Sequence, residues 1–425
     1  MEPLKLREDL FVAIRTDLFE LLGLTVPIES SRTKNMDLET LRNLAEQNDV
    51  TIADHDNYRR VPPHYFDSLR NAFEFYFNTF NTQNASYNFY AEGLSMHPLR
   101  ATKHDFLDEE NTVLAIVAFE RFFELFLKNL LWMTNENLTY TRKKGKLPID
   151  KLIAEINART FEPLAMDGKP FTIPFRETLT RFYGLIDLHK QGLSDPIVTA
   201  FSVILSKHIF LDSSDHQASL ELLNWYRDRI LHNGNKLPSL WMLDYFVTQH
   251  LIPIIAEIIR AEKDTLAESM FYFTTLTHID LIKELTSIRF EFNQLHDPQE
   301  MQDTVQTLLF IGHLKELGRA NLNMNLYMRN NTQATYEYNY KDPKGRGRRF
   351  ASVEKNEHPH AIQVSKCICC GEESMVVYRE TIDDIFNPGS KKHIEWVKCY
   401  TCDYHIRYNA GDPYLFNLKE DKLFT

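Results

Sequence analysis

The chain has 425 residues, of which 43% are hydrophobic and 12% aromatic, enough apolar surface for two or three domains with buried cores. Its formal net charge of −11 argues against a uniformly basic protein that coats nucleic acid, although a local basic groove remains compatible with it. No segment has the length and lack of charge of a membrane-spanning helix, and the N-terminus lacks the apolar core of a signal peptide, so we expect a soluble cytoplasmic protein without a membrane partner.

Residues 1–104 predict a mixed, partly helical N-terminal region. Apolar residues recur every three or four positions over 4–23, which indicates an amphipathic helix, and a second helix is expected over 37–47. The segment 60–80 predicts an extended stretch around its two prolines, followed by a helix. A polar, aromatic loop is expected over 81–93.

Residues 105–265 predict a bundle of helices. The segment 111–132 is apolar on most sides and contains neither Pro nor Gly, so we expect it to be a central helix. Further helices are expected near Asp150, over 175–189, over 217–231 and over 239–263, where Pro253 is expected either to kink the helix or to mark its first turns. Residues 266–324 predict a helical extension interrupted at 296–298.

Residues 325–425 predict a β-rich module. Alternating Tyr and polar residues followed by a Gly- and Pro-containing turn predict a β-hairpin with its tip at KDPKGRGRR. Short strands are expected after it, over 374–380, 394–399 and 405–409. The tip carries five cations that are candidate nucleic-acid-binding residues: Lys341, Lys344, Arg346, Arg348 and Arg349. Such a run attracts phosphates, and the alternative is an ordinary solvated loop.

All five cysteines lie between positions 367 and 402. Two Cys-x2-Cys pairs, Cys367 with Cys370 and Cys399 with Cys402, supply the four thiolates of a closed structural zinc site, and the segment resembles a zinc ribbon. Cys369 is the spare and remains an alternative to Cys370. Because a catalytic zinc keeps an open position, we expect structural zinc and no catalytic metal.

An Arg and a His separated by four to six residues occur at three places in the chain. Arg227 with His232 differs from the other two pairs because Asp228 follows the Arg and the pair ends an apolar-periodic helix. This arrangement resembles the motif of HEPN-domain ribonucleases, and 111–132 resembles their first helix, with Glu120, Glu124 and Lys128 along an apolar run. The resemblance covers about 105–265. It implies a mainly α fold, a HEPN-like helical bundle with flanking helices, here followed by the small β-rich zinc ribbon.

The resemblance also implies an endoribonuclease that needs no metal. His232 would move protons, Arg227 would stabilise the charge of the phosphorane-like transition state, and Asp228 would orient them. The substrate would be RNA, cut by attack of its own 2′-OH. The resemblance to this family further implies a homodimer with a shared cleft and a role as a toxin or anti-phage abortive-infection effector. It also implies an antitoxin or a phage-derived trigger as a partner.

Two other readings stay open. Arg227 and His232 can be a surface ion-pairing residue and a helix-capping residue without any catalytic role. The whole chain can then be a non-catalytic adaptor that binds nucleic acid or protein through its zinc ribbon.

Overall fold

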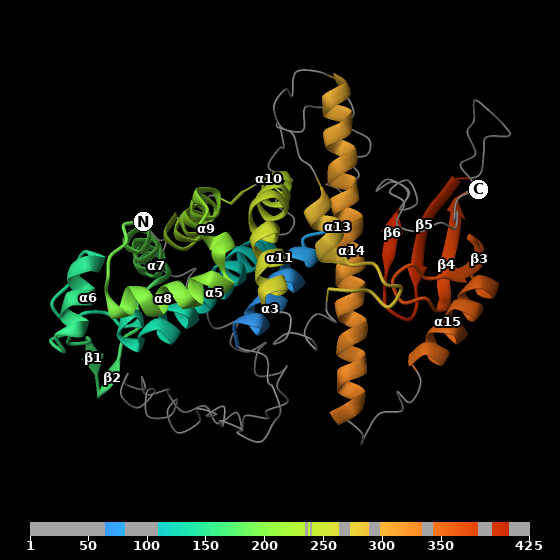
Figure 1. The fold of residues 1–425 in the computed structure, drawn as a ribbon. Helices are drawn as coiled ribbons and strands as arrows, with labels where there is room; N and C mark the ends of the chain where they lie inside the picture. The colour runs from blue at the N-terminus through green and yellow to red at the C-terminus, as the bar shows by residue number, and fades with distance from the viewer. Residues whose placement is uncertain are drawn as a thin grey trace, which may run out of the picture. The chain divides into compact units, whose positions relative to one another are not determined.

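The computed structural model describes residues 64–80, 109–233, 237–238, 240–262, 273–288, 298–333, 343–380 and 393–407, all within the unit Arg60–Thr425. Over these residues the fold is mainly helical, with a small antiparallel sheet near the C-terminus (Figure 1), as the sequence predicts. The helices predicted over 4–23 and 37–47 and the loop predicted over 81–93 lie outside the described residues.

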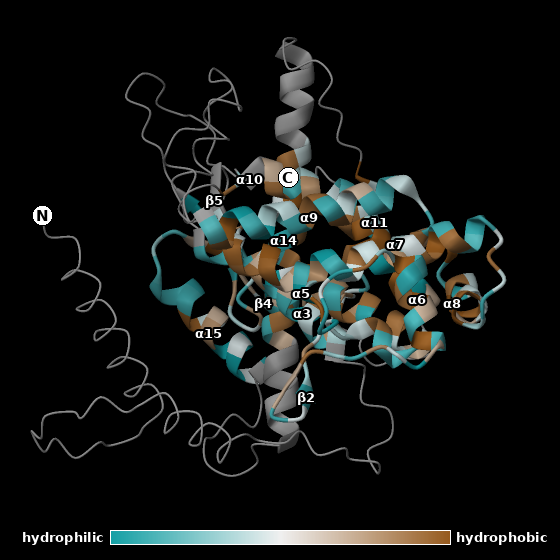
Figure 2. Ribbon diagram, turned by 90° about the vertical axis from the view of Figure 1, so that its left-hand side faces the viewer, coloured by the Kyte–Doolittle hydropathy of each residue, from teal (hydrophilic) through white to brown (hydrophobic). Residues whose placement is uncertain are grey.

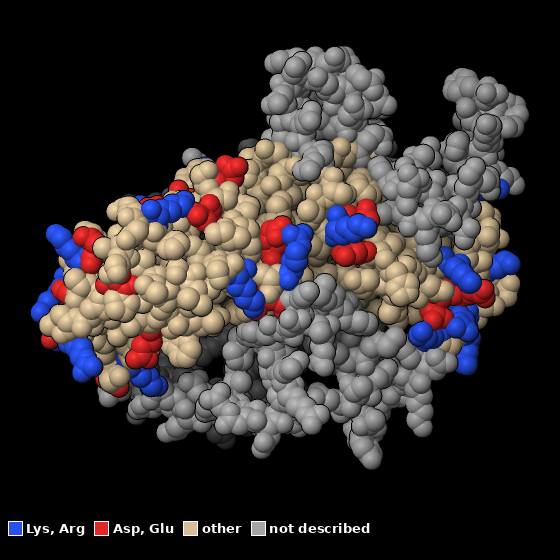
Figure 3. Space-filling model, in the orientation of Figure 1, with Lys and Arg blue, Asp and Glu red and all other residues tan. Residues whose placement is uncertain are grey.

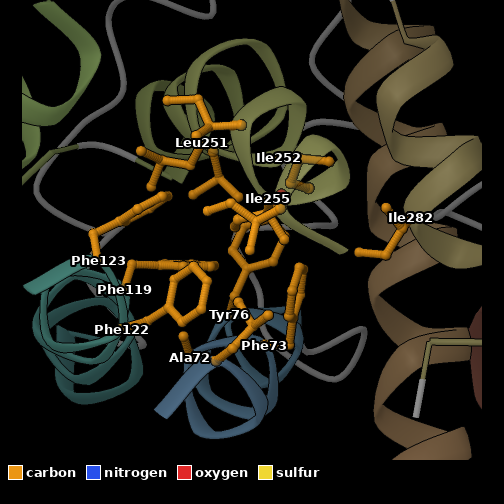
Figure 4. Packing of buried hydrophobic residues seen from close by; sticks show 14 of the residues in the cluster. Ala72, Phe73, Tyr76, Phe119, Phe122, Phe123, Leu251, Ile252, Ile255 and Ile282 are labelled. Atoms are coloured by element: carbon orange, nitrogen blue, oxygen red, sulfur yellow. The ribbon is translucent and has the colours of Figure 1, made fainter. Parts of the chain in front are cut away.

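Helix α5, Glu109–Thr134, is the central helix predicted over 111–132. It packs against α3, His64–Asn78, and against three further helices described below. Phe119, Phe122 and Phe123 are fully buried, because apolar residues occupy nearly every side of the helix. Figure 4 shows these rings facing Phe73 and Tyr76 of α3. The core of the helical body is therefore largely aromatic.

The remaining helices surround this pair and confirm most of the predicted elements, with one addition. The prediction omitted α8, which begins at Pro196 after the side chain of Asp195 caps its first turn. Hydrophobic and hydrophilic residues alternate along these helices (Figure 2). Their bounds are Ile149–Asn157 for α6, Phe175–Lys190 for α7, Pro196–Lys207 for α8, Ser214–Asn233 for α9, Leu240–Phe246 for α10, Ile252–Ala261 for α11 and Leu281–Ser287 for α13.

Pro253 interrupts the predicted helix 239–263 as expected. The residues before it, Val247–Leu251, form a π-helical turn between α10 and α11, and Pro253 lies in the first turn of α11. A proline has no N–H to donate to the preceding turn, so a locally widened helix accommodates it. The stretch Met242–Ala261 is also the one described helix with the length and composition to cross a membrane, but most of it is buried in the helical body.

Helix α14, Pro298–Gln333, is the longest described helix and packs against α3 and α13. Two glycines allow the close contact with α3 and with Phe80, which follows it. A Cβ at Gly312 would overlap the ring of Phe80, and one at Gly318 would overlap the ring of Phe77. The two helices therefore approach more closely than larger residues would allow.

The β-hairpin predicted after residue 325 is wrong. Helix α14 continues to Gln333, and α15, Pro343–Glu357, occupies most of the predicted hairpin tip. Residues 334–342, which include Lys341, lie outside the described residues. Pro343 begins α15, where its missing N–H has no helical acceptor to bond, and Gly345 and Gly347 lie within the helix.

Four antiparallel strands follow in the order β3-β4-β5-β6. Strands were predicted at the positions of β4, β5 and β6, whereas β3 was not predicted. Ala351 of α15 packs on Val376 and Tyr378 of the sheet in a small second core. The bounds are Ala361–Lys366 for β3, Glu373–Glu380 for β4, His393–Cys399 for β5 and His405–Arg407 for β6; a two-stranded hairpin, β1 (Ala165–Met166) with β2 (Lys169–Pro170), lies in the helical body.

The cysteine-bearing module shares its core with the helical body. Buried residues such as Ile368 and Val377 belong to the same hydrophobic cluster as the aromatic residues of α3 and α5. Polar contacts reinforce the junction, because the Arg319 guanidinium of α14 pairs with Glu316 at 2.7 Å and with Asp403 at 3.2 Å. The sequence suggested an appended module, and the structure integrates it with α14.

Candidate functional site

The four cysteines predicted as metal ligands converge on one point. Their Sγ atoms all lie within 4.8 Å of one another, and all four residues are buried. The Sγ atoms of Cys367 and Cys402 are 3.6 Å apart, and those of Cys370 and Cys399 are 3.7 Å apart. A tetrahedral ion with metal–sulfur bonds of about 2.3 Å needs sulfur separations of about 3.8 Å. The cluster therefore has the size and the donor set of a structural metal site.

Two matching turns hold these ligands. The N–H groups of Cys369 and Thr401 each donate to the Sγ of the cysteine two positions before, at 3.4 Å. The N–H groups of Gly371 and Asp403 close each turn onto a cysteine carbonyl, at 2.9 and 3.0 Å. Both residues have a positive φ, of 73° and 62°. Glycine adopts this left-handed conformation without strain at position 371, and Asp403 repeats it in the second turn.

Full ionisation of these four cysteines would require a cation. Burial raises the pKa of the Cys367 and Cys402 thiols, whereas hydrogen bonds from Cys367 and the other cysteines lower the pKa of Cys399. Four thiolates cannot be ionised together in a buried space without a positive partner. A bound metal ion supplies that partner and would deprotonate all four.

Cys369 is the spare cysteine, and it is not one of the four cysteines that cluster. Its thiol donates to the carbonyl oxygen of Leu317 in α14 at 3.6 Å. The four clustered sulfur atoms include that of Cys370 and not that of Cys369, so the structure favours Cys370 as the ligand. Cys369 instead belongs to the contact between the module and the helical body.

The predicted catalytic residues lie on α9, where it packs against α5. The guanidinium of Arg227 donates to Asp228 at 2.9 Å and lies 3.8 Å from the carboxylate of Glu120 on α5. Asp228 also accepts from the side-chain amide of Asn224 at 3.2 Å. The Arg227 side chain is 34% exposed and that of Asp228 is 38% exposed, so both reach solvent. The structure thus brings Arg227 and Asp228 together and adds Glu120.

Among the residues around Arg227, Glu120 is the one whose pKa the fold shifts most. Glu120 is only 4% exposed, because it lies on the side of α5 that packs against α9. Burial, and then the charge of Glu124, raise the pKa of Glu120 to about 7 against the opposing effect of Arg227. A carboxyl with such a pKa changes charge near neutral pH.

Glu120→Gln is expected to stabilise the protein at about pH 8 and not at about pH 4. The folded state holds the Glu120 proton more tightly than the unfolded state, so stability falls as pH rises from the unfolded pKa toward about 7. The lost stability reaches about 3 kcal/mol above that pH, and glutamine, which cannot ionise, avoids it. Urea unfolding of both proteins at the two pH values measures the effect. An equal difference at both values would contradict it.

His232 is exposed in the last turn of α9, five residues after Arg227. A cavity of about 780 Å³ runs beside the same helix and is lined by Glu221, Asn224, Trp225 and Asp228, with residues of α6 and α7 opposite. On a helix of 3.6 residues per turn, His232 follows Asp228 on the same face. The structure therefore places His232 on the helix face that borders the cavity, one turn beyond its lining residues.

The four described cations of the predicted nucleic-acid-binding set do not form one cluster, and Lys341 lies outside the described residues. Lys344 and Arg348 both pair with Glu372 of the module, at 2.9 and 2.5 Å. The Arg346 guanidinium stacks over the ring of Phe350 at 5.2 Å, and Arg349 is exposed. On the face shown in Figure 3, basic and acidic side chains of the described residues intermingle. Two of the five cations therefore tie α15 to the module.

Sequence reasoning did not assign a role to Glu120 and did not find the cavity. The one available signal for Glu120 was a charged residue in an otherwise apolar helix. Its partner Arg227 is 107 positions away, and only the fold shows that they meet. Comparison of the chain with family models, with curated proteins and with solved structures gives no match, so the chemistry of the site rests on these residues alone.

Proposed function

We propose that the chain is a metal-independent endoribonuclease of the HEPN type, with Arg227, Asp228 and His232 as its catalytic residues. The observation that carries this proposal is the arrangement on α9. A guanidinium held by Asp228 and an exposed imidazole lie in the C-terminal half of one helix, and Asp228 itself lines a cavity. Both side chains reach solvent and are not buried in the core, as contact with a substrate requires.

The residue types fit the chemistry of RNA cleavage. RNA supplies its own nucleophile, the 2′-OH, so the protein has to move protons and stabilise negative charge. His232 is exposed and has a side chain that can donate or accept a proton near neutral pH. Arg227 remains cationic and presents a planar fork to phosphate oxygens. The expected products are a 2′,3′-cyclic phosphate and a 5′-OH.

Helix geometry supports a homodimer. Five residues separate Arg227 from His232, which turns the two side chains about 140° apart around the axis of α9. One copy of the helix does not direct both groups at the same point. Two copies facing each other across a cleft would place Arg227 of one protomer near His232 of the other.

The four cysteines hold a structural zinc ion in this proposal. Thiolates are the ligands that zinc prefers in closed tetrahedral sites, and four of them leave no position for water or substrate. The ion would stabilise the module and take no part in cleavage. RNA cleavage is therefore expected to continue in the presence of EDTA.

His232→Ala and Arg227→Ala are each expected to reduce RNA cleavage by about 10²–10⁴-fold, the usual contribution of a general acid–base group or an oxyanion-stabilising group. The assay incubates purified wild type and variants with tRNA and mRNA in the presence of EDTA. His189→Ala is the matched control for His232, because His189 is also exposed in the last turn of a helix, α7.

Arg260→Ala is the control for Arg227, since Arg260 is an exposed, ion-paired arginine near the end of α11. Both control variants should cleave like wild type. An inactive wild type, or active His232→Ala and Arg227→Ala variants, contradicts the nuclease. A confirmed nuclease would suit a toxin or anti-phage effector, with an antitoxin or phage-derived trigger as its partner.

A non-catalytic adaptor is the second candidate, and α15 is the observation that favours it. Arg346, Arg349, Phe350 and Val353 recur at helical spacing and are all exposed, so they form a basic and apolar face on the cysteine-bearing module. Such a face can contact phosphates and stack on bases. RNA binding without cleavage by wild type would support this function.

A further inference from the structure

We propose that Glu120 is a positioning residue that sets the charge Arg227 presents to an RNA phosphate, so that substrate affinity falls as pH rises through neutrality. This inference rests on the proposed nuclease. Glu120 does not touch the reacting atoms and acts through the guanidinium beside it.

The geometry places one guanidinium between two carboxyl groups. Arg227 Nη1 lies 2.9 Å from Oδ1 of Asp228, and Arg227 Nε lies 3.8 Å from Oε1 of Glu120. Asp228 is part of the half-exposed surface, whereas Glu120 lies behind the guanidinium in the interface of α5 and α9. An RNA phosphate can therefore approach Arg227 only from its solvent-exposed side. Glu120 lies on the opposite, buried side of the guanidinium.

The ionisation of Glu120 decides the net charge around Arg227, because the other nearby charges are already paired. Glu124, one turn further along α5, is already paired with Lys128 at 2.5 Å and with Arg121 at 3.3 Å. Arg227 then has to neutralise both Glu120 and Asp228. With both ionised the group carries a net charge of −1 and repels a phosphate, whereas protonation of Glu120 brings it to zero. The charged groups that act on Glu120 are Arg121 and Glu124 of α5 and Arg227 and Asp228 of α9.

The pKa of Glu120, raised to about 7 chiefly by its burial, puts this change in the physiological range. Below that pH Glu120 is neutral and Arg227 is available to the phosphate. Above it the carboxylate competes with the phosphate for the same guanidinium. Binding of RNA near neutral pH should therefore be accompanied by uptake of a proton at Glu120.

Glu120→Gln separates charge from shape, because glutamine keeps a side-chain oxygen that can accept from Arg227 and never ionises. At about pH 8 the variant is expected to have a KM for RNA about tenfold lower than wild type, the effect of about one nearby charge. At about pH 5.5 the two KM values should agree, since Glu120 is then protonated in wild type. The kcat of the variant should stay close to that of wild type.

Two controls show whether the effect is specific. Glu257→Gln removes an exposed carboxylate of α11 and should leave KM and its pH dependence unchanged. Glu124→Gln removes a charge that raises the pKa of Glu120, so the midpoint of the wild-type KM profile should move to lower pH. A purely structural role of Glu120 would alter stability without producing either shift.

The dissociation constant for the same RNA, measured by fluorescence anisotropy in a His232→Ala background, separates this inference from the nuclease itself. Affinity that weakens about tenfold above neutral pH, and no longer does so after Glu120→Gln, supports the role of Glu120. If wild type cleaves RNA but Glu120→Gln leaves the KM and affinity profiles unchanged, the positioning role is wrong and the nuclease stands. If wild type neither cleaves nor binds RNA, both proposals fail.

Discussion

Replacing Cys399 by serine is expected to abolish metal binding and to unfold the sheet β3–β6. Cys399 is one of four mutually close thiols, and its Sγ lies 3.7 Å from that of Cys370. A structural zinc site contributes about 10–16 kcal/mol of binding free energy, most of which is folding free energy of its module. Three buried cysteines cannot hold the ion in the same closed shell. Metal analysis of the purified chain, with limited proteolysis of residues 343–407, measures both effects.

Cys369→Ser is the matched control. Cys369 is also buried and is adjacent in sequence to a ligand, yet it is not one of the four clustered cysteines, and its thiol donates to the Leu317 carbonyl. This variant should retain one metal ion per chain and a protease-resistant module. Loss of metal from Cys369→Ser and retention by Cys399→Ser would contradict the ligand set.

Cys399→Ser should also destabilise the helical body. The module shares its hydrophobic cluster with the helices, and its second cysteine turn accepts contacts from Arg319 of α14. Cys399→Ser is therefore expected to lower the thermal unfolding temperature of the whole chain. A separately tethered zinc ribbon would instead melt alone.

The sequence predicted those elements whose signals are local. Helices α3, α5, α7 and α9 carry apolar residues at helical spacing, and the two cysteines of each pair have two residues between them. Both patterns can be recognised within a few turns of chain. The long central helix was predicted to within two residues at each end.

Helix α15 shows why the local signals failed elsewhere. Pro343, Gly345 and Gly347 are turn residues by propensity, so the segment predicted a hairpin tip. The fold uses them differently, since a Cβ at Gly347 would overlap the side chain of Thr401 in the second cysteine turn. The helix is stabilised by this close packing and by the pairs of Lys344 and Arg348 with Glu372. Tertiary contacts of this kind override propensity and are absent from a local pattern.

Lys315→Ala is expected to destabilise the chain by about 3–5 kcal/mol, the usual cost of leaving a buried charge without its partner. Lys315 of α14 is fully buried, its Nζ lies 2.9 Å from Asp244 of α10, and it stands 4.7 Å from the ring centroid of Tyr76 in α3. Alanine would leave the Asp244 carboxylate in the core without a cation. Urea unfolding measures the loss.

Lys190→Ala is the control for this effect. Its ion pair with Asp212 is as short, at 2.5 Å, but the lysine side chain is 55% exposed, so we expect a cost of about 0–1 kcal/mol. Replacing both buried partners, Lys315→Met with Asp244→Leu, should restore most of the lost stability, because no unpaired charge then remains. Equal losses for Lys315→Ala and Lys190→Ala would show that the buried pair is not the cause.

The position of Lys315 explains why this pair affects more than one helix contact. Lys315 faces the helical body, while Glu316, the next residue of α14, accepts from the N–H of His405 in the module at 2.6 Å. One turn of α14 thus joins the helical bundle that bears Arg227 to the module that bears the cysteines. Lys315→Ala should loosen the first contact and leave the cysteine cluster intact, so we expect lower stability with one metal ion still bound per chain. Loss of metal from this variant would mean that the module cannot hold its ion without the helical body.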